Sequence, residues 1–247
     1  NIAVAGADTN YALITSGGFV GIGTSSPDNL LDLEGTNCEI RLSRTATSQR
    51  AGISFVTNGA ETNGAWAIRM NDGGGTDATP DLSFHKFTGT DTEIMRLTDA
   101  GSITAPLQPA FYVRPSGTVS DVDASSDVDI AFATETFDQG SDFSTPTFTA
   151  PVTGKYQFNF MIHLQDIDNA ATDIKINLVA SNGTVEWRYS IDDLSAGADI
   201  DDWSPTGSML IDMDASDTAK LTLYQGGGST SILDIHADSR FSGYLVC

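Results

Sequence analysis

Apolar and polar side chains alternate with a period of two along much of the chain. The clearest run covers residues 156–165, where aromatic and aliphatic side chains occupy every second position, and shorter runs cover residues 174–178 and 220–224. Clusters such as Ser181-Asn182-Gly183 separate these runs, as turns separate strands. We find no window of a dozen residues with apolar side chains at helical spacing. The pattern therefore predicts an all-β fold.

Differences in composition and in the pattern of predicted strands divide the chain into four segments. Residues 1–35 are rich in glycine and weakly hydrophobic, and we interpret them as a thin β shaft. Residues 99–109 contain Pro106 and Pro109, which favour an extended linker or a second short shaft. Residues 110–247 hold a dense aromatic core and form a predicted head. Between the two shafts, residues 36–98 predict a β-rich middle domain, with strands at residues 39–42, 51–56, 65–70, 81–86 and 93–97.

One internal echo relates the two shaft segments. Residues 13–20 and residues 96–103 both run from a hydrophobic residue through a Thr and a Gly-containing turn to a β-branched residue. A unit this short cannot bury a core of its own, so it would need partner chains. Two unrelated turns that use common turn residues would produce the same echo.

The charge balance excludes several classes of partner. The chain has 12 Lys and Arg against 33 Asp and Glu, a net charge of −21. Nucleic acid is bound by clustered cations, so we expect no nucleic-acid partner, and we expect no direct attraction to an anionic membrane surface. The roughly 20 consecutive apolar residues of a membrane span are missing, so no membrane insertion is expected. The balance suits a protein that stays soluble outside a cell.

The chain ends and the cysteines leave questions open. The first residues, NIAVAGADTN, lack the basic start and apolar core of a signal peptide, and without an initial Met the chain could be a fragment or a processed product. Cys38 and Cys247 lie far apart, and neither has another Cys or a His at metal-ligand spacing. A disulfide between them or two free thiols both fit the sequence.

Three features of the head belong together: the stretch FTAPVTGKYQFNF at residues 148–160, the chain end FSGYLV at residues 241–246, and a predicted late hairpin with Asp217 at its turn. Through them the head resembles the globular head of complement subcomponent C1q, a jelly-roll that is shared with tumour necrosis factor. The gap between Phe143 and Phe148 is shorter than is usual in that family. The resemblance implies a homotrimer, with the aromatic face of residues 156–160 buried partly at the three-fold axis. Its core and trimer signature consists of Phe148, Gly154, Tyr156, Phe158, Phe160, Phe241 and Gly243.

A second resemblance lies near the start of the chain. The motif GFVGIGTSSP at residues 18–27, followed by LLDL at residues 30–33, is similar to the repeated stalk motif of phage tail fibres and related bacterial surface proteins. Residues 95–107 look like the same shaft re-entering before the head. Both resemblances imply three-fold symmetry. There is no collagen-like tract of the kind that precedes complement heads in animals.

Clusters of acidic residues offer oxygen ligands to calcium. We predict such a site at one or more acidic loops, above all at Asp121, Asp123, Asp127 and Asp129; the runs at residues 166–169 and 199–202 are further candidates. None has the spacing of a helix–loop–helix calcium motif. Solvated loop acids that keep the protein soluble are the alternative interpretation.

Exposed aromatic and polar groups suggest a receptor contact. Trp203 lies in a polar stretch, and its ring could cover the apolar face of a sugar while neighbouring acids and amides bind hydroxyls. The candidate contact residues are Trp203, Asp201, Asp202, Asp168 and Asn169. Trp187 and Tyr189 follow strand alternation, which favours packing.

The sequence gives no sign of catalysis. His85, His163 and His236 fit the polar faces of alternating strands, and no Gly-x-Ser-x-Gly nucleophile motif or phosphate loop is present. The resemblances imply the distal part of a phage tail fibre, located in the extracellular virion. It would bind a bacterial surface glycan or protein with its head, and other tail proteins through its N-terminal side. A bacterial adhesin or surface filament subunit, located at the cell surface, is the first alternative; a secreted complement-like protein and a depolymerase tailspike are less consistent with this texture.

Overall fold

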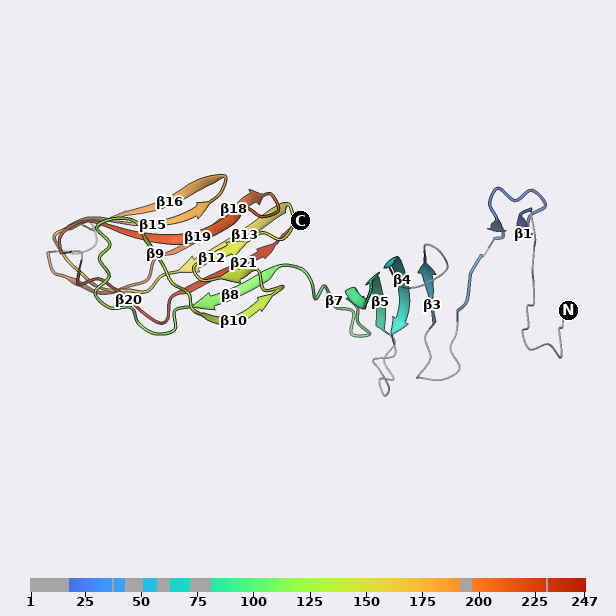
Figure 1. Cartoon of the computed structure of the whole chain (residues 1–247), viewed down its shortest axis with the longest axis horizontal. Coiled ribbons are helices and arrows are strands. Elements are labelled where there is room, and N and C mark those ends of the chain that lie inside the picture. Colours follow the sequence, from blue (N-terminus) through green and yellow to red (C-terminus); the bar gives the residue numbers. More distant parts are fainter. Residues whose placement is uncertain are drawn as a thin grey trace.

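The computed structural model describes residues 18–36, 38–42, 51–56, 63–71, 81–191, 197–229 and 231–247. The regular elements among them are all strands, which confirms the all-β prediction. The sheets follow one another along an elongated molecule (Figure 1), from β1 through the sheet that contains β3 to β7, to a large head. Within these ranges, no helix is long and apolar enough to span a membrane.

The shaft motif forms a small parallel sheet in which β1 (Val20–Ile22) pairs with β2 (Leu31–Leu33). The connecting loop depends on Gly23, which has a φ of +87° and lies so close to the backbone of Glu34 that no Cβ would fit. The echo between the two shaft segments aligns Gly18 with Gly101, and both adopt a φ of +82°. Residues 1–17, which hold the rest of the first predicted shaft, lie outside the described residues.

The middle segment forms a five-stranded antiparallel sheet in sequence order. Its strands are β3 (Ala51–Phe55), β4 (Asn63–Asn71), β5 (Asp81–Thr88), β6 (Asp91–Leu97) and β7 (Ile103–Thr104). The strand predicted at residues 39–42 is wrong, because residues 38–42 are irregular. Ile103, in the segment predicted as a short shaft or linker, pairs with Leu97 across a tight turn at Gly101, so that this part of residues 99–109 is the edge of the sheet.

The head is a sandwich of two antiparallel sheets. The first has five strands in the order β10-β8-β21-β13-β18, and the second has six strands in the order β11-β12-β19-β15-β16 together with β9. The first sheet consists of β8 (Ala110–Arg114), β10 (Thr134–Gln139), β13 (Gly154–Met161), β18 (Thr206–Met213) and β21 (Arg240–Leu245). The second consists of β9 (Val128–Asp129), β11 (Phe143–Ser144), β12 (Thr147–Thr149), β15 (Ala171–Ala180), β16 (Gly183–Ser190) and β19 (Thr218–Gly227).

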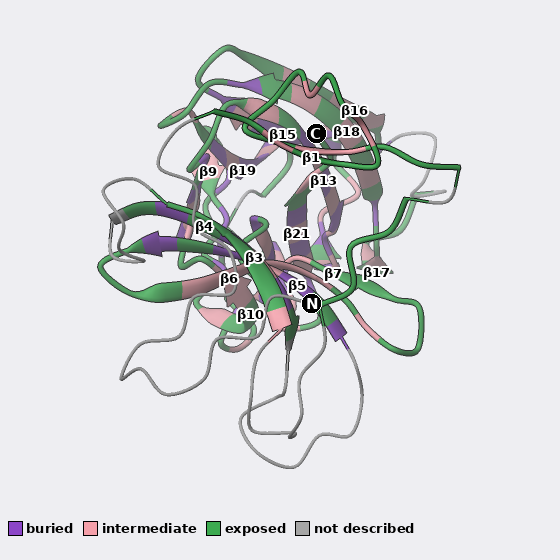
Figure 2. Cartoon of the chain, turned by 90° about the vertical axis from the view of Figure 1, so that its right-hand side faces the viewer, coloured by how far each residue is buried: buried purple, intermediate pink, exposed green. Residues whose placement is uncertain are grey.

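Aromatic side chains from both sheets fill the space between them, and the buried strands are visible in Figure 2. The rings of Phe111 and Phe148 stack with centroids 5.0 Å apart, and Phe158 stacks on Phe241 at 5.9 Å. Each such ring stabilises the fold by roughly 1.5–3 kcal/mol through burial. Tyr156, Phe158 and Phe160 are already buried within one chain. The expectation that they lie partly at a three-fold axis is therefore wrong; the residues of β13 between them, such as Gln157 and Asn159, face outward.

Two connections in the head differ from the prediction. The predicted hairpin around Asp217 is instead a crossing between the two sheets, because β18 pairs with β13 whereas β19 pairs with β15. The alternating run at residues 156–165 does not form one strand. It breaks at His163, after which the chain leaves the five-stranded sheet and enters a separate small sheet as β14 (Leu164–Ile167).

Candidate functional site

A three-stranded sheet closes the end of the head that points away from the β3–β7 sheet, where Figure 1 labels β20. It has the order β17-β14-β20, with β17 at Ile200–Trp203 and β20 at Asp234–Ile235. We refer to this sheet and the turns that adjoin it as the tip. The five residues predicted as receptor contacts all lie here: Asp201, Asp202 and Trp203 on β17, and Asp168 and Asn169 in the turn after β14. The fold thus brings together two acidic segments that are separated in sequence.

The side chains of Asp168 and Asn169, in the turn after β14, form hydrogen bonds with backbone groups. The two carboxylate oxygens of Asp168 accept hydrogen bonds from the N–H of Ala170 at 2.8 Å and of Ser229 at 2.6 Å. These bonds favour the ionised form and hold the pKa of Asp168 below its usual value. The amide of Asn169 donates to the carbonyl of Gly197 at 2.9 Å. Both side chains therefore help to shape the turn and remain half-exposed.

Trp203, which the sequence places in a polar stretch, lies in a strand. It ends strand β17, opposite Leu164, and its half-buried ring meets the ring of Tyr189 edge-on at 4.8 Å. Trp187 packs in the same way against Phe160 at 4.9 Å, which confirms the packing interpretation of Trp187 and Tyr189. Trp203 can present only the uncovered part of its ring to a ligand.

Asp202 anchors a hydrogen-bond cluster that the sequence did not reveal. One of its carboxylate oxygens accepts hydrogen bonds from Nε2 of His163 and from Nε2 of Gln165, both at 2.8 Å. The hydrogen bond from His163 is the main reason why the pKa of Asp202 lies below its usual value. Because an ionised carboxylate only accepts hydrogen bonds, Nε2 of His163 carries a proton. A single polar residue in an alternating run gave no signal of this partnership.

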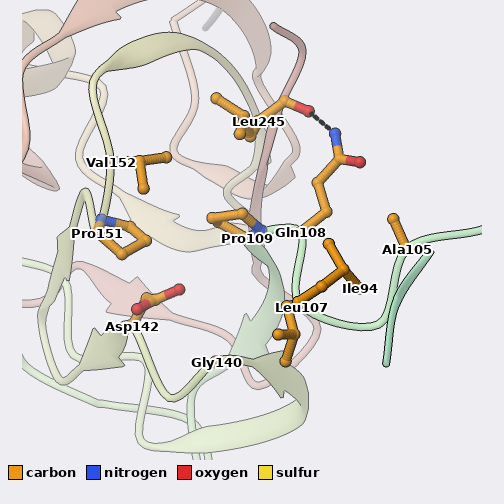
Figure 3. Close-up of a pocket in the computed structure, with 10 residues that line it drawn as sticks. All are labelled: Ile94, Ala105, Leu107, Gln108, Pro109, Gly140, Asp142, Pro151, Val152 and Leu245. Atoms are coloured by element: carbon orange, nitrogen blue, oxygen red, sulfur yellow. Dashed lines mark hydrogen bonds between the residues drawn. The ribbon is translucent and has the colours of Figure 1, made fainter. Parts of the chain in front are cut away.

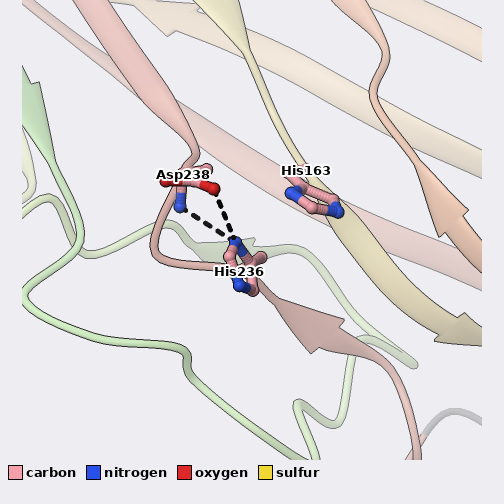
Figure 4. A group of neighbouring side chains, drawn as sticks. All are labelled: His163, His236 and Asp238. Carbon is pink, nitrogen blue, oxygen red and sulfur yellow. Dashed lines mark hydrogen bonds and ion pairs between the residues drawn. The ribbon is translucent and has the colours of Figure 1, made fainter.

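His236 and Asp238 lie beside His163 on the turn that follows β20 (Figure 4). The two imidazole rings have centroids 4.5 Å apart, and Nδ1 of His236 is 3.4 Å from a carboxylate oxygen of Asp238. One potential ligand atom from each of the three residues lies within 4.8 Å of the others. These residue types in this arrangement can hold a proton or a transition-metal ion.

The four acidic residues that we favoured for calcium do not converge. Asp127 accepts a hydrogen bond from the amide of Asn177 at 3.2 Å, and Asp129 pairs with Lys220 at 2.7 Å. Asp123 accepts a bond from the backbone N–H of Ser125, and the backbone of Asp121 donates to Asp234. Among the described residues, no close group of three or more metal-ligating side chains includes any of the four. Calcium binding at these loops stays a prediction.

A groove of about 520 Å³ lies at the opposite end of the head, where the chain enters from the middle sheet (Figure 3). Its lining is largely apolar and includes Ile94 of β6 and Leu245 of β21. Gln108 crosses it and donates to the carbonyl of Leu245 at 2.8 Å. Burial, with the nearby Asp138 charge, raises the pKa of Asp142 at its edge. The groove offers packing surface between head and middle sheet rather than convergent polar groups.

Comparisons with known proteins found a family match and several similar solved structures. The C1q domain family model matches residues 110–246. The globular domain of the zebrafish complement 1qA protein is 17% identical and matches 57% of this chain and 98% of its own, with a TM-score of 0.41. Murine APRIL (8% identity, 56% and 99%, TM-score 0.40) and the PRD1 vertex protein P5 (15% identity, 57% and 99%, TM-score 0.39) are also similar. Comparison with curated proteins finds no match.

Proposed function

We propose that this chain, which belongs to the C1q domain family, forms the distal part of a phage tail fibre and attaches the particle to a receptor on a bacterial host. The observation that carries this proposal is the position of the tip. The tip gathers half-exposed acidic, amide and imidazole groups at the far end of an elongated chain whose other end consists of short β segments. Such a surface suits the hydroxyl groups of a glycan or the polar face of a protein receptor.

A homotrimer is part of the proposal. C1q domains typically form homotrimers and are typically extracellular, and they are generally binding modules rather than enzymes. Three heads on one fibre raise avidity even when each single site is weak, as long as the receptors are spaced to engage them together. Exposed apolar side chains on the outer surface of the β10–β18 sheet, such as Phe137, Leu210 and Tyr244, offer contact area between the three heads. Other tail proteins would bind on the N-terminal side of the chain.

The attachment role can be tested with the labelled full chain and a panel of bacterial strains. We expect saturable binding to cells of at least one strain, competed by its surface polysaccharide or abolished by protease treatment of the cells. Asp201→Ala, an exposed change at the tip, should weaken binding, and Glu135→Ala, an exposed change on β10, should not. Equal binding by both variants would contradict the assignment of the tip.

A bacterial adhesin or surface filament subunit with the same head is the alternative. It shares the head and the trimer, so the genes that neighbour the coding sequence would separate it from a tail fibre. A depolymerase would release reducing ends from host polysaccharide, whereas a binding protein would not. We expect none to be released.

Calcium at the acidic loops remains a separate proposal. Three chains would bring together about three times the charge of −21, and bound divalent cations would offset part of that repulsion. Thermal unfolding should therefore shift to lower temperature after chelation, and calcium alone should restore it. A melting temperature that does not respond to calcium would exclude the site.

A further inference from the structure

We propose that His163, His236 and Asp238 bind a divalent transition-metal ion, such as Zn²⁺, at the tip of the head. The three come from two segments, the break between β13 and β14 and the turn after β20. One ligand atom of each lies within 4.8 Å of the others. Figure 4 shows the side chains directed toward one another. Two imidazoles and a carboxylate are ligands that Zn²⁺ and Cu²⁺ accept, whereas Ca²⁺ takes oxygen ligands.

The distances fit an ion with little rearrangement. Zinc–ligand bonds of about 2.0–2.2 Å in a tetrahedron place neighbouring ligand atoms roughly 3.4 Å apart. Nδ1 of His236 and Oδ2 of Asp238 are 3.4 Å apart. The backbone N–H of Asp238 donates to the same Nδ1 at 3.2 Å, so this nitrogen already presents its lone pair, which a metal would take over. The ligand atom of His163 lies within 4.8 Å of the other two, so it must move by roughly 1.5 Å at most, which rotation of this half-exposed side chain supplies.

The backbone around the cluster is fixed. The N–H of His236 donates to the carbonyl of His163 at 2.8 Å, and the N–H of His163 donates to Oγ of Ser239 at 3.0 Å. Ser239 is fully buried, and its own N–H donates to the carbonyl of His236 at 3.0 Å. The backbones of both histidines thus belong to one hydrogen-bonded frame, so the binding of an ion costs little conformational entropy.

Asp202 prepares His163 for this role. Its carboxylate accepts the Nε2 proton of His163, which leaves Nδ1 of that ring as the free ligand atom. A carboxylate that holds the outer nitrogen of a metal-bound histidine is the usual outer partner of such sites, and its removal typically costs tenfold to a hundredfold in metal affinity. Gln165 holds the carboxylate in place from the neighbouring strand. The three ligands leave a fourth coordination position for water.

The experiment is a zinc titration of the full chain, without a histidine tag and after removal of metals, followed by calorimetry. We expect one Zn²⁺ per chain. His236→Asn and Asp238→Asn should lower the affinity more than tenfold, and Asp202→Asn about tenfold. Asp201→Asn is the matched control, because it removes an exposed carboxylate from the same end of the head without removing a ligand. Its affinity should equal that of the wild type.

Asp238 is exposed, so Asp238→Asn should leave the fold intact even if His236→Asn does not. The visible absorption of bound Co²⁺ gives a second reading of the same site, which should be present in Asp201→Asn and lost in Asp238→Asn. The proposal is overturned if the wild type binds no stoichiometric zinc, or if Asp238→Asn binds it as tightly as Asp201→Asn. These readings do not involve a host receptor, so they are independent of the attachment role.

Discussion

Two glycines of the head stand where a neighbouring strand leaves no room for a side chain. A Cβ at Gly243 would lie 2.7 Å from ring atoms of Phe111 and Phe158, and a Cβ at Gly154 would lie 2.6 Å from the carbonyl oxygen of Cys247. Both glycines belong to the signature through which the sequence resembles C1q heads. The structure gives the physical reason for them: aromatic rings pack against the backbone of β21 at Gly243, and the end of the chain covers Gly154.

We expect Gly243→Ala to lower the free energy of unfolding by about 1–3 kcal/mol, the usual cost of overpacking a core. Gly117→Ala is the control, because nothing lies within 4 Å of its Cβ position. Denaturant unfolding of both variants measures the difference. Equal stability of the two variants would show that the core can yield around Gly243.

Ion pairs on one face of the middle sheet make its stability depend on pH. Asp81 pairs with Arg96 at 2.6 Å, and this hydrogen bond is the main reason why the pKa of Asp81 lies below its ordinary value of 3.8. A carboxyl group with a lowered pKa in the folded state stabilises the fold above its unfolded pKa, and the contribution is lost as the pH falls through its folded pKa. The sheet should therefore lose stability below about pH 4.

Asp81→Asn keeps the shape of the side chain and removes this titration. We expect the variant to melt at a lower temperature than the wild type at pH 7, with a difference that narrows as the pH approaches 3. Calorimetry at both values measures it. A difference that is the same at pH 7 and pH 3 would mean that the charge of Asp81 does not contribute.

The middle sheet has an unusual distribution of side chains on its two faces. On the face with Arg69, His85 and Asp91, the carboxylate of Asp91 forms an ion pair with Arg69 at 2.6 Å and a hydrogen bond with Nδ1 of His85 at 2.7 Å, and the side chains of Arg69 and His85 are buried. The opposite face is apolar and exposed. One row of directly paired residues crosses all five strands, and side chains paired in this way share a face: Ala51, Met70, Leu82, Leu97 and Ile103.

An apolar face of this kind in a single chain favours burial against copies of the same chain. Leu82→Lys, in the central strand, should weaken the trimer by about 1.5–3 kcal/mol per chain, the value of one buried leucine. Val119→Lys places the same charge at a similarly exposed site of the head and serves as the control. Sedimentation over a dilution series would show the first variant dissociating earlier; identical dissociation would contradict this use of the face.

Sequence periodicity predicted strands well and their partners poorly. The alternating positions of residues 156–164 are buried as expected, because alternation reports only which face a side chain takes. The break at His163 and the pairing of Ile103 with Leu97 depend on which strands pair with one another, and strand pairing gives no signal in the local sequence pattern. The sequence offered two acidic segments as candidate contacts, and the fold brings them to the same end of the head, whereas the cluster of His163 with His236 left no signal in the sequence.

At the scale of the whole molecule, family membership and shape point to the same arrangement. The C1q head occupies one end of an elongated chain, its polar tip faces away from the rest, and apolar surfaces on the head and on the middle sheet remain uncovered. A trimer would cover these surfaces and present three tips in one direction, as a fibre that attaches to a cell requires.

The most direct test is the mass of the purified chain in solution, measured by light scattering. We expect three times 26.0 kDa, retained on dilution to concentrations at which attachment would be assayed. A mass of 26.0 kDa would rule out the trimer. It would leave the apolar face of the middle sheet unexplained and remove the trivalent attachment on which the proposed function depends.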